Sequence, residues 1–269
     1  MFTMGVGVST FYLAEEMRTE RAKKRDVFQF PSRKYTDPKY ILTDPLKYWN
    51  SLPSEDRTVG TILGINTMVF LGWRFYPEAM VPHFLHMNMS GKVYTLITST
   101  FSHNNGPHFL FNMVALWSFG RHIHHYLGQE YFTAFYLTSG AFSALCSHLF
   151  YGLTRQPVAS LGASGALFGL VGLVYGLFPN AQINLFFVLP FAAKTIIPGV
   201  ATFDLIGLFG AWLRWFRLDH AAHLGGLLLG VLFSTTYFHP QKHFMIRNYA
   251  SQKKKQLNTF LNNINQKSH

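Results

Sequence analysis

The sequence has little charge and almost no cysteine. Only 13% of its 269 residues are charged, whereas 49% are hydrophobic. The single cysteine, Cys146, excludes an intrachain disulfide framework and a zinc site built from several cysteines, so we expect a thiol in the core. Acidic residues are absent from residues 239–269 and rare between residues 58 and 238. A long apolar middle with so few charges is typical of a membrane protein.

The uneven distribution of charge divides the chain into four parts. Residues 1–14 are apolar but shorter than the ~20 residues that span a bilayer, and they predict a partial N-terminal transmembrane helix. Residues 15–57 are highly charged and contain several prolines, as expected of an extramembrane linker. Residues 58–238 form the predicted membrane domain, and residues 239–269 a basic C-terminal tail with a solvated lysine run at Lys253–Lys255.

The net charge of +11 does not indicate a nucleic-acid partner. Outside the tail, no basic stripe interleaved with aromatic residues occurs, and such a stripe is what nucleic-acid recognition requires. The expected surroundings are therefore a lipid bilayer, with no nucleic acid.

Apolar runs predict an all-α, polytopic membrane protein with a six-helix core and one additional, apparently truncated, N-terminal helix. The predicted core spans are Val59–Trp73, Pro107–Tyr126, Glu130–Leu153, Ser164–Phe178, Ala193–Phe209 and Asp219–Phe238. We expect Phe75–Gly106 to be a re-entrant or interfacial loop and Ile183–Phe191 to be a buried extended connection. The fourth span is only about 22 Å long at 1.5 Å per residue, so its N-terminus should lie below the membrane surface.

The fourth and sixth spans each carry a face of small residues. Helical spacing aligns four glycines of the fourth span, Gly165, Gly169, Gly172 and Gly176, and it aligns His223, Gly226 and Gly230 of the sixth. Small residues let two helix backbones approach closely. If these faces meet, Ser164 and His223 should also meet.

Span counting brings further polar residues to the same depth. The second, fourth and sixth spans start on one side of the membrane, and they carry His108 with Asn112, Ser164 and His223 near those ends. A serine hydroxyl needs a base to accept its proton, and histidine suits that role near neutral pH. A helix N-terminus offers free N–H groups to an oxyanion, and His108 and Asn112 could donate more. The pattern predicts a Ser-His dyad for acyl transfer.

Other interpretations remain for each of these residues. Ser164 could be a packing residue, His223 a hydrogen-bonded helix-packing group, and His108 with Asn112 an interfacial cap. Phe168 should pack near Ser164 and could stack on His223.

Two acids lie near the predicted site. Asp219, one turn before His223, raises the possibility of a Ser-His-Asp triad, but a helix N-cap is the commoner role and a dyad is predicted. Asp204 should be a buried polar group satisfied by a neighbour other than Lys194, which lies ten residues away.

Histidine clusters offer a metal-binding alternative. His220 with His223 is one candidate, and the group His122, His124 and His125 is another. Neither has an acid at HExxH-like spacing, so we expect no metal and no cofactor.

The motifs HFLFN (His108–Asn112), GASG (Gly162–Gly165) and AHLGG (Ala222–Gly226) resemble those of the rhomboid intramembrane serine proteases in order and spacing. The strings YWNSLPSEDR, STFSH, LWSF, LGQE, SLGASGA and DHAAHLGG are similar to the mitochondrial, presenilin-associated branch of that family. The resemblance covers approximately Tyr48 to Phe238.

The resemblance implies a role for each matching position. Ser164 would be the nucleophile and His223 the general base, while His108, Asn112 and the Ser164 N–H would form the oxyanion site. Gly162 of the GASG motif would support that site, and His103 resembles a structural or water-holding histidine of the first loop.

The resemblance also implies substrates and a location. The family cleaves single-span membrane proteins, which would enter past Ala193–Phe209 beneath a cap formed by Gly210–Leu218. The branch is multi-pass in the mitochondrial inner membrane, with one helix ahead of the six. The basic linker and tail would face the matrix by the positive-inside rule, whereas the branch is described in the opposite orientation.

Two rival functions use the same residues. A catalytically silent relative would bind transmembrane helices without cutting them, but it need not keep both Ser164 and His223. A channel or transporter would spread polar residues through several helices, whereas those here gather at one end.

Overall fold

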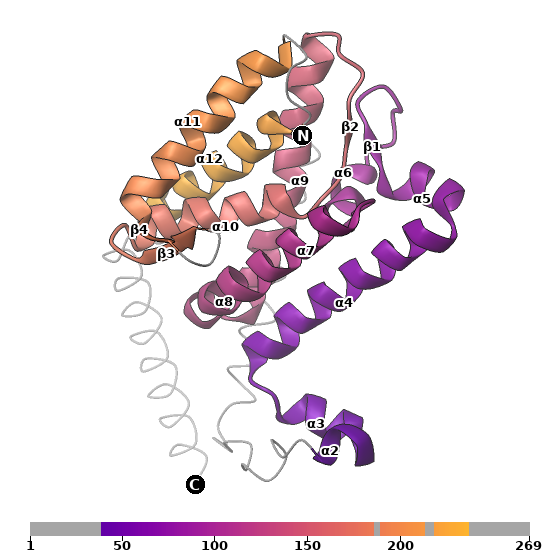
Figure 1. Ribbon diagram of the computed structural model, residues 1–269, viewed down its shortest axis with the longest axis vertical. Coiled ribbons are helices and arrows are strands. Elements are labelled where there is room, and N and C mark those ends of the chain that lie inside the picture. Colours follow the sequence, from indigo (N-terminus) through magenta and orange to yellow (C-terminus); the bar gives the residue numbers. More distant parts are fainter. Residues whose placement is uncertain (1–38, 186–188, 213–217, 237–269) are drawn as a thin grey trace, which may run out of the picture.

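The computed structural model describes residues 39–185, 189–212 and 218–236, and this part of the chain is mostly helical (Figure 1). Its long helices are α4 (Ser54–Phe75), α9 (Gln129–Leu153), α10 (Ser164–Leu177), α11 (Ala193–Trp212) and α12 (His220–Thr236). A further helical stretch runs without a break through α7 (Gly106–Ala115), the π-helix η3 (Leu116–Gly120) and α8 (Arg121–Leu127). The shorter helices are α2 (Lys39–Thr43), α3 (Pro45–Ser51), α5 (Pro77–Phe84), α6 (Thr95–Thr98) and the 3-10 helix η2 (Ser99–Phe101).

Two small antiparallel sheets join the helices. Strand β1 (His86–Met87) pairs with β2 (Ala159–Ser160), which ties the loop after α5 to the segment that leads into α10. Strands β3 (Gln182–Leu185) and β4 (Leu189–Ala192) form a hairpin between α10 and α11.

The helix boundaries lie within a few residues of the predicted apolar spans. The loop Phe75–Gly106 contains only short elements, as expected of a segment that does not cross a bilayer. The prediction for Ile183–Phe191 was half wrong: this segment is extended, but Leu189 is 52% exposed and Phe191 37% exposed. Because β4 pairs with β3 in a two-stranded hairpin, its side chains are not enclosed by the strands of a larger sheet. The predicted N-terminal helix at residues 1–14 and the tail lie outside the described residues.

Local sequence signals explain where the helices begin. α4 follows Pro53, has Glu55 and Asp56 in its first turn and Arg74 in its last, an arrangement that complements the helix dipole. The Asn105 side chain caps α7 by accepting the His108 N–H at 2.8 Å. Asp219 caps α12 in the same way, because its Oδ1 accepts the Ala222 N–H at 3.1 Å, which confirms the N-cap prediction.

Helices α10 and α12 pack more closely than any other pair of described helices. A Cβ at Gly226 would overlap the Gly165 carbonyl oxygen, and a Cβ at Gly172 would overlap the Leu227 carbonyl oxygen. The glycine faces therefore meet, as their spacing predicts. α10 lies in the middle of the bundle, with α9, α11 and α12 around it (Figure 1).

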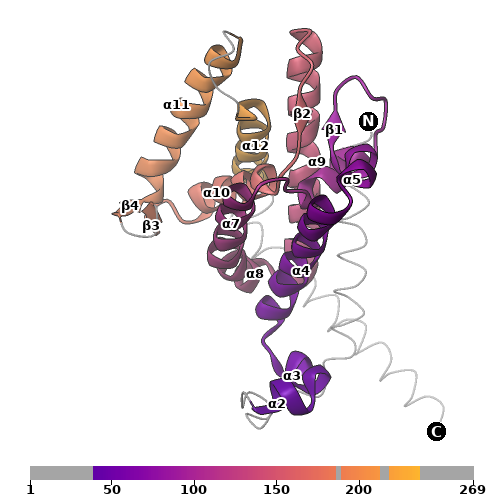
Figure 2. The ribbon, with the colours of Figure 1, turned by 45° about the vertical axis from the view of Figure 1, so that its right-hand side comes forward.

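Helix α11 lies at an edge of the bundle in both views (Figures 1 and 2). Its outward side chains are apolar and open, with Phe203, Ile206 and Phe209 at 52%, 63% and 72% exposure. Among the described residues, one stretch is both long and apolar enough to cross a membrane by length and composition, Ala193–Gly210 in this helix, and Ser164–Leu177 is a shorter apolar helix. An apolar outer face of this kind is compatible with contact to lipid.

Candidate active site

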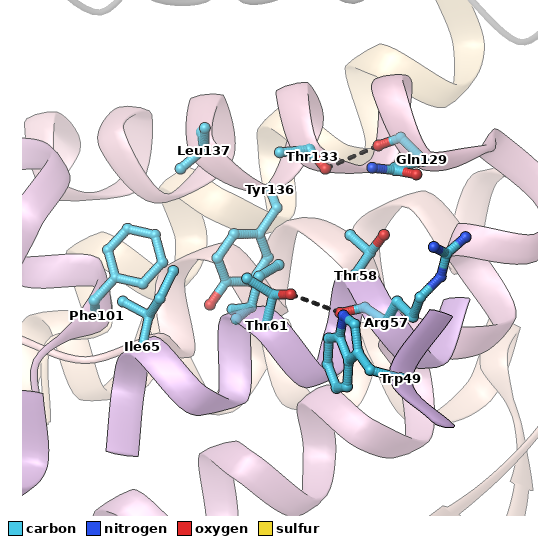
Figure 3. Close-up of a pocket in the computed structure, with 11 residues that line it drawn as sticks. Trp49, Arg57, Thr58, Thr61, Ile65, Phe101, Gln129, Thr133, Tyr136 and Leu137 are labelled. Atoms are coloured by element: carbon cyan, nitrogen blue, oxygen red, sulfur yellow. Dashed lines mark hydrogen bonds between the residues drawn. The ribbon is translucent and has the colours of Figure 1, made fainter. Parts of the chain in front are cut away.

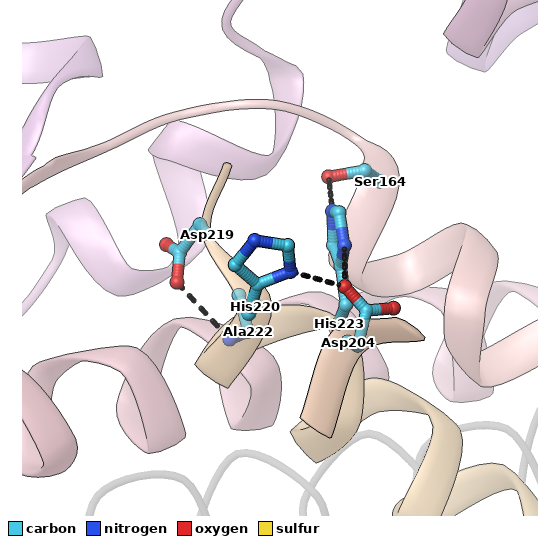
Figure 4. Close-up of polar contacts among 6 residues, drawn as sticks. All are labelled: Ser164, Asp204, Asp219, His220, Ala222 and His223. Carbon is cyan, nitrogen blue, oxygen red and sulfur yellow. Dashed lines mark hydrogen bonds and ion pairs between the residues drawn. The ribbon is translucent and has the colours of Figure 1, made fainter. Parts of the chain in front are cut away.

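Ser164 is the first residue of α10, and its hydroxyl meets His223 from α12 (Figure 4). The distance from Ser164 Oγ to His223 Nε2 is 3.1 Å. The close packing of α10 on α12 brings these two side chains together, since Ser164 precedes the first glycine of one face and His223 stands one turn before Gly226 on the other. The structure thus joins the two residues that the sequence predicts as a pair.

Phe168 holds the imidazole of His223 from one side. Its ring is parallel to the imidazole, with a centroid distance of 4.1 Å and an interplanar angle of 6°. Phe168 stands one turn after Ser164 on α10, so a single helix supplies both the hydroxyl and the stacking surface. This stack restricts rotation of the His223 ring and keeps Nε2 directed at Ser164.

The other ring nitrogen of His223 bonds to a carboxylate that the sequence had not assigned to the site. His223 Nδ1 lies 3.0 Å from Asp204 Oδ1, and His220 Nδ1 lies 2.6 Å from the same oxygen (Figure 4). Asp204 is 1% exposed and His220 fully buried. A carboxylate at Nδ1 favours the tautomer that carries its proton there, which leaves Nε2 free to accept one.

Asp204 was expected to be satisfied by a neighbour other than Lys194, and the neighbours are His220 and His223. The available signal was an acid within an otherwise apolar helix, since such a residue normally has a definite partner. That signal does not name the partner, because Asp204 lies in the middle of α11 and the sequence does not show how α11 packs on α12.

Asp219, the other acid considered, serves the framework around the site. Besides capping α12, its Oδ2 accepts hydrogen bonds from Ser147 at 2.8 Å and from the Ser160 hydroxyl. These contacts join α9, β2 and α12, and none of them is to the His223 side chain. Of the two acids, it is Asp204 that is placed to act on the imidazole.

Gly162 lines the space between Ser164 and His108. It has φ +132°, a conformation that side chains rarely adopt, and a Cβ there would lie 2.9 Å from His108 Nε2 and 3.8 Å from Ser164 Oγ. A small volume next to Gly162 is therefore within reach of both the hydroxyl and the imidazole of His108. The first N–H groups of α10 have no partner inside the helix, and they are near the same volume.

His103 and Asn112 contact the residues around this volume, Ala163 and His108. The His103 Nε2 accepts the Ala163 N–H at 3.3 Å, and its ring meets the His108 ring edge-on at a centroid distance of 5.0 Å. Burial is the main cause that lowers the pKa of His103 to about 3, and the neighbouring His108 is the second, so this ring is neutral. The Asn112 amide donates to the His108 carbonyl oxygen at 2.8 Å, a bond within one helical turn.

The histidines 122, 124 and 125 do not converge on one point. His122 Nδ1 bonds the Ser118 carbonyl oxygen at 2.7 Å, and His124 Nε2 bonds the Thr58 hydroxyl at 3.1 Å. His125 instead approaches Glu55 at 3.7 Å. Within the described residues, the group with the geometry to hold a metal ion is Asp204, His220 and His223, whose ligand atoms all lie within 4.8 Å of one another.

Two cavities lie away from Ser164. One of about 560 Å³ lies between α4 and α9 and includes Trp49, Arg57, Phe101 and Tyr136 in its lining (Figure 3). The other, of about 550 Å³, lies near the C-terminal end of α10 and includes His122 and Phe178. Neither is lined by any of the predicted site residues. The candidate site is therefore defined by the convergence of polar groups on α10, α11 and α12.

The sequence of this chain matches known proteins of one family. The rhomboid domain model matches residues 90–240. The chain is 37% identical over 195 residues to the presenilin-associated rhomboid-like protein, mitochondrial, of Mus musculus, covering 70% of this chain and 51% of that protein. It is 37% identical over 202 residues to Rhomboid protein 1, mitochondrial, of Saccharomyces cerevisiae, covering 70% and 55%.

A more distant plant relative, RHOMBOID-like protein 12, mitochondrial, of Arabidopsis thaliana, is 28% identical over 212 residues, covering 69% of this chain and 60% of that protein. The chain spans about half the length of the curated relatives it matches. The domain match includes Ser164, Asp204 and His223, and it extends over more than half of the chain. The chain belongs to the rhomboid family.

Proposed function

We propose that this protein is an intramembrane serine endopeptidase that hydrolyses peptide bonds in or near the transmembrane segment of single-span membrane proteins. The observation that carries the proposal is the contact of Ser164 Oγ with His223 Nε2 at 3.1 Å. The imidazole of His223 is also stacked on Phe168 and hydrogen-bonded to Asp204. A hydroxyl, a base and a group that orients the base are the parts of a nucleophilic acyl-transfer site.

In this mechanism Ser164 Oγ attacks the carbonyl carbon of the scissile bond while His223 Nε2 takes the hydroxyl proton. The carbonyl oxygen becomes an oxyanion and occupies the volume beside Gly162. The Ser164 N–H and His108 would donate to it there, with the Asn112 amide as a further donor. His223 then delivers its proton to the leaving amine, and a water activated by the same nitrogen hydrolyses the acyl enzyme.

Asp204 acts on His223 in every step of this reaction. Its carboxylate holds the Nδ1 proton in place and stabilises the imidazolium that forms when Nε2 accepts a proton. The sequence predicts a dyad, and the contact with Asp204 supports adding an orienting acid to it.

We propose that the core crosses the bilayer six times, with α10 as a short helix whose N-terminus lies below the surface. Ser164 would then sit at membrane depth beside a route for water. The apolar outer face of α11 would contact lipid or a substrate helix, since Ile206 and Phe209 are largely exposed. The names of the relatives support a mitochondrial location, and we propose the inner membrane.

The test is reconstitution in lipid vesicles with a single-span protein substrate. Wild type should cleave it, whereas Ser164→Ala and His223→Ala should lose at least about 10³-fold in rate. Ser118→Ala and His122→Ala are matched controls away from the site, and they should keep the wild-type rate. Equal cleavage by wild type and both site variants would sink the proposal.

A catalytically silent, helix-binding protein is the second candidate function, because a bound substrate helix would use the same outer face of α11. A photo-crosslinkable substrate separates the two. Crosslinking to wild type without any cleavage product favours the silent protein, and labelling of wild type but not of Ser164→Ala by a fluorophosphonate favours the protease.

A further inference from the structure

We propose that Asp204, His220 and His223 form a binding site for a divalent transition-metal ion such as Zn²⁺, and that the ion switches off the candidate active site when it binds. The inference rests on the proposed function for its inhibitory effect, but not for the binding of the metal. It departs from the expectation, drawn from sequence spacing alone, that the chain holds no metal.

The three ligand atoms are already gathered. Asp204 Oδ1 lies 2.6 Å from His220 Nδ1 and 3.0 Å from His223 Nδ1. In a tetrahedral zinc site, bonds of about 2.0–2.2 Å separate neighbouring ligand atoms by about 3.3 Å. Each atom therefore needs to move by less than about 1 Å to surround an ion. Two imidazoles and one carboxylate are also a ligand set that zinc accepts, with water at the fourth position.

The surroundings allow that movement. Asp204 comes from α11 and both histidines from α12, so a small outward shift of α11 opens the cluster. α11 lies at the edge of the bundle (Figure 2), and Leu205 and Ile206 beside Asp204 are 48% and 63% exposed. Water can reach the ion from the Ser164 side, because the His223 side chain is 12% exposed whereas that of His220 is fully buried.

Metal binding would change which nitrogen of His223 carries the proton. In the metal-free site Nδ1 donates its proton in a hydrogen bond to Asp204, and Nε2 accepts a hydrogen bond from the Ser164 hydroxyl. An ion bound at Nδ1 requires that nitrogen to be unprotonated, so the ring proton moves to Nε2. The same shift occurs in His220, and no proton is gained or lost overall. With a proton on Nε2, His223 has no lone pair to take the Ser164 proton, and the first step stops.

Binding is measured without relying on catalysis. We would titrate Co²⁺ into the Ser164→Ala variant, free of any histidine tag, and follow the visible absorption of a tetrahedral site. The expected result is an absorption band that reaches saturation with one added ion and disappears on replacement by excess Zn²⁺. Adding His220→Gln or Asp204→Ala should weaken binding by at least about 10- to 100-fold. His148→Gln, which removes a histidine of α9 outside the cluster, is the matched control.

Inhibition is measured on the active chain. Zn²⁺ should lower the cleavage rate of wild type at least about tenfold, a chelator should restore it, and His220→Gln should need at least about tenfold more Zn²⁺ for the same fractional inhibition. Absence of the Co²⁺ band, or a band unaffected by both His220→Gln and Asp204→Ala, would overturn the metal site. Equal Zn²⁺ sensitivity of wild type and His220→Gln would overturn the switch. A normal band in a chain with no protease activity would leave the metal site standing and overturn only the proposed function.

Discussion

Asp204 and His223 are joined across the interface of α11 and α12 by a bond of 3.0 Å between a carboxylate oxygen and Nδ1. The helix that supplies the carboxylate also presents an open apolar face, with Ile206 63% and Phe209 72% exposed. Any displacement of α11 would therefore act directly on the orientation of the imidazole. The position of α11 is therefore coupled through Asp204 to the His223 ring, whose Nε2 lies 3.1 Å from Ser164 Oγ.

Replacing Asp204 by Asn should slow catalysis with little effect on substrate binding. Asn can bond to either tautomer of His223, so Nδ1 no longer holds its proton reliably. The tautomer effect in a soluble triad is about 10⁴, and we expect a fall in kcat of about 10²–10⁴-fold with KM nearly unchanged. Cleavage is measured in vesicles with a chelator present, so that metal binding does not contribute.

Asp219→Asn is the matched control, because Asp219 lies only four residues before His223 but caps α12 and accepts hydrogen bonds from Ser147 and Ser160. It should keep most of the rate while lowering thermal stability. A normal kcat in Asp204→Asn would mean that Asp204 is only a buried partner of His220.

Replacing Gly162 by Ala adds only one methyl group, but it should strongly reduce the cleavage rate. The new methyl group would lie 2.7 Å from His108 Cε1 and 3.8 Å from Ser164 Oγ, within the volume assigned to the oxyanion. Loss of a single oxyanion donor typically costs about 10²–10³ in kcat, and we expect a loss of that size. Gly152→Ala, where a Cβ meets nothing within 4 Å, serves as the control. Near-wild-type cleavage by Gly162→Ala would move the oxyanion site elsewhere.

The sequence predicted the paired helices but not the full site. The spacing of Gly165, Gly169 and Gly226 identified a close helix contact, and the polar residues at helix starts identified Ser164 and His223. Those signals work because helical periodicity fixes which side chains share a face. The partner of Asp204 depends on how α11 leans on α12, which periodicity does not determine. The exposure of β4 was missed for the same reason, since an apolar run does not tell which element covers it.

Removing the ring of Phe168 should weaken catalysis moderately. Its stack on His223, at 4.1 Å between centroids, is of a kind that contributes about 0.5–1.5 kcal/mol. Phe168→Leu keeps most of the volume but not the ring, and it should lower kcat by roughly 2- to 10-fold. Phe168→Tyr retains the ring and should differ little from wild type. A wild-type kcat in Phe168→Leu would show that the site needs the packing volume of Phe168 and not its stack on His223.

Acid should destabilise the fold through His86. This ring lies between the Thr95 hydroxyl and His148, at 2.8 Å and 3.0 Å. Burial and then the nearby His148 lower the pKa of His86 from 6.5 to about 4, with a smaller opposing effect from Asp219. The unfolded chain binds a proton near pH 6.5 but the folded chain does not, so stability should fall as the pH drops from 6.5 to 4.

The melting temperature in detergent, measured from pH 7.5 to 4.5, checks this prediction. His86→Gln should flatten part of the decline, because Gln cannot take up the proton in either state. His122→Gln, at an exposed position, should decline as steeply as wild type. A wild-type melting temperature that is constant over this range contradicts the prediction.

Enlarging Gly226 should separate the two helices that carry Ser164 and His223. A Cβ at this position would overlap the Gly165 carbonyl oxygen, a backbone atom that cannot rotate away. Forcing extra volume into a packed interface costs about 1–3 kcal/mol, and we expect Gly226→Ala to lower the unfolding free energy by about that amount. Gly64→Ala is the matched control on α4, where a Cβ meets nothing within 4 Å, and it should be neutral or stabilising by up to about 1 kcal/mol. Ser164 and His223 face each other across this interface of α10 and α12. The loss of activity in Gly226→Ala should therefore exceed the loss of folded protein. Equal stability of the two glycine variants would show that α10 and α12 can adjust their contact without disturbing the site.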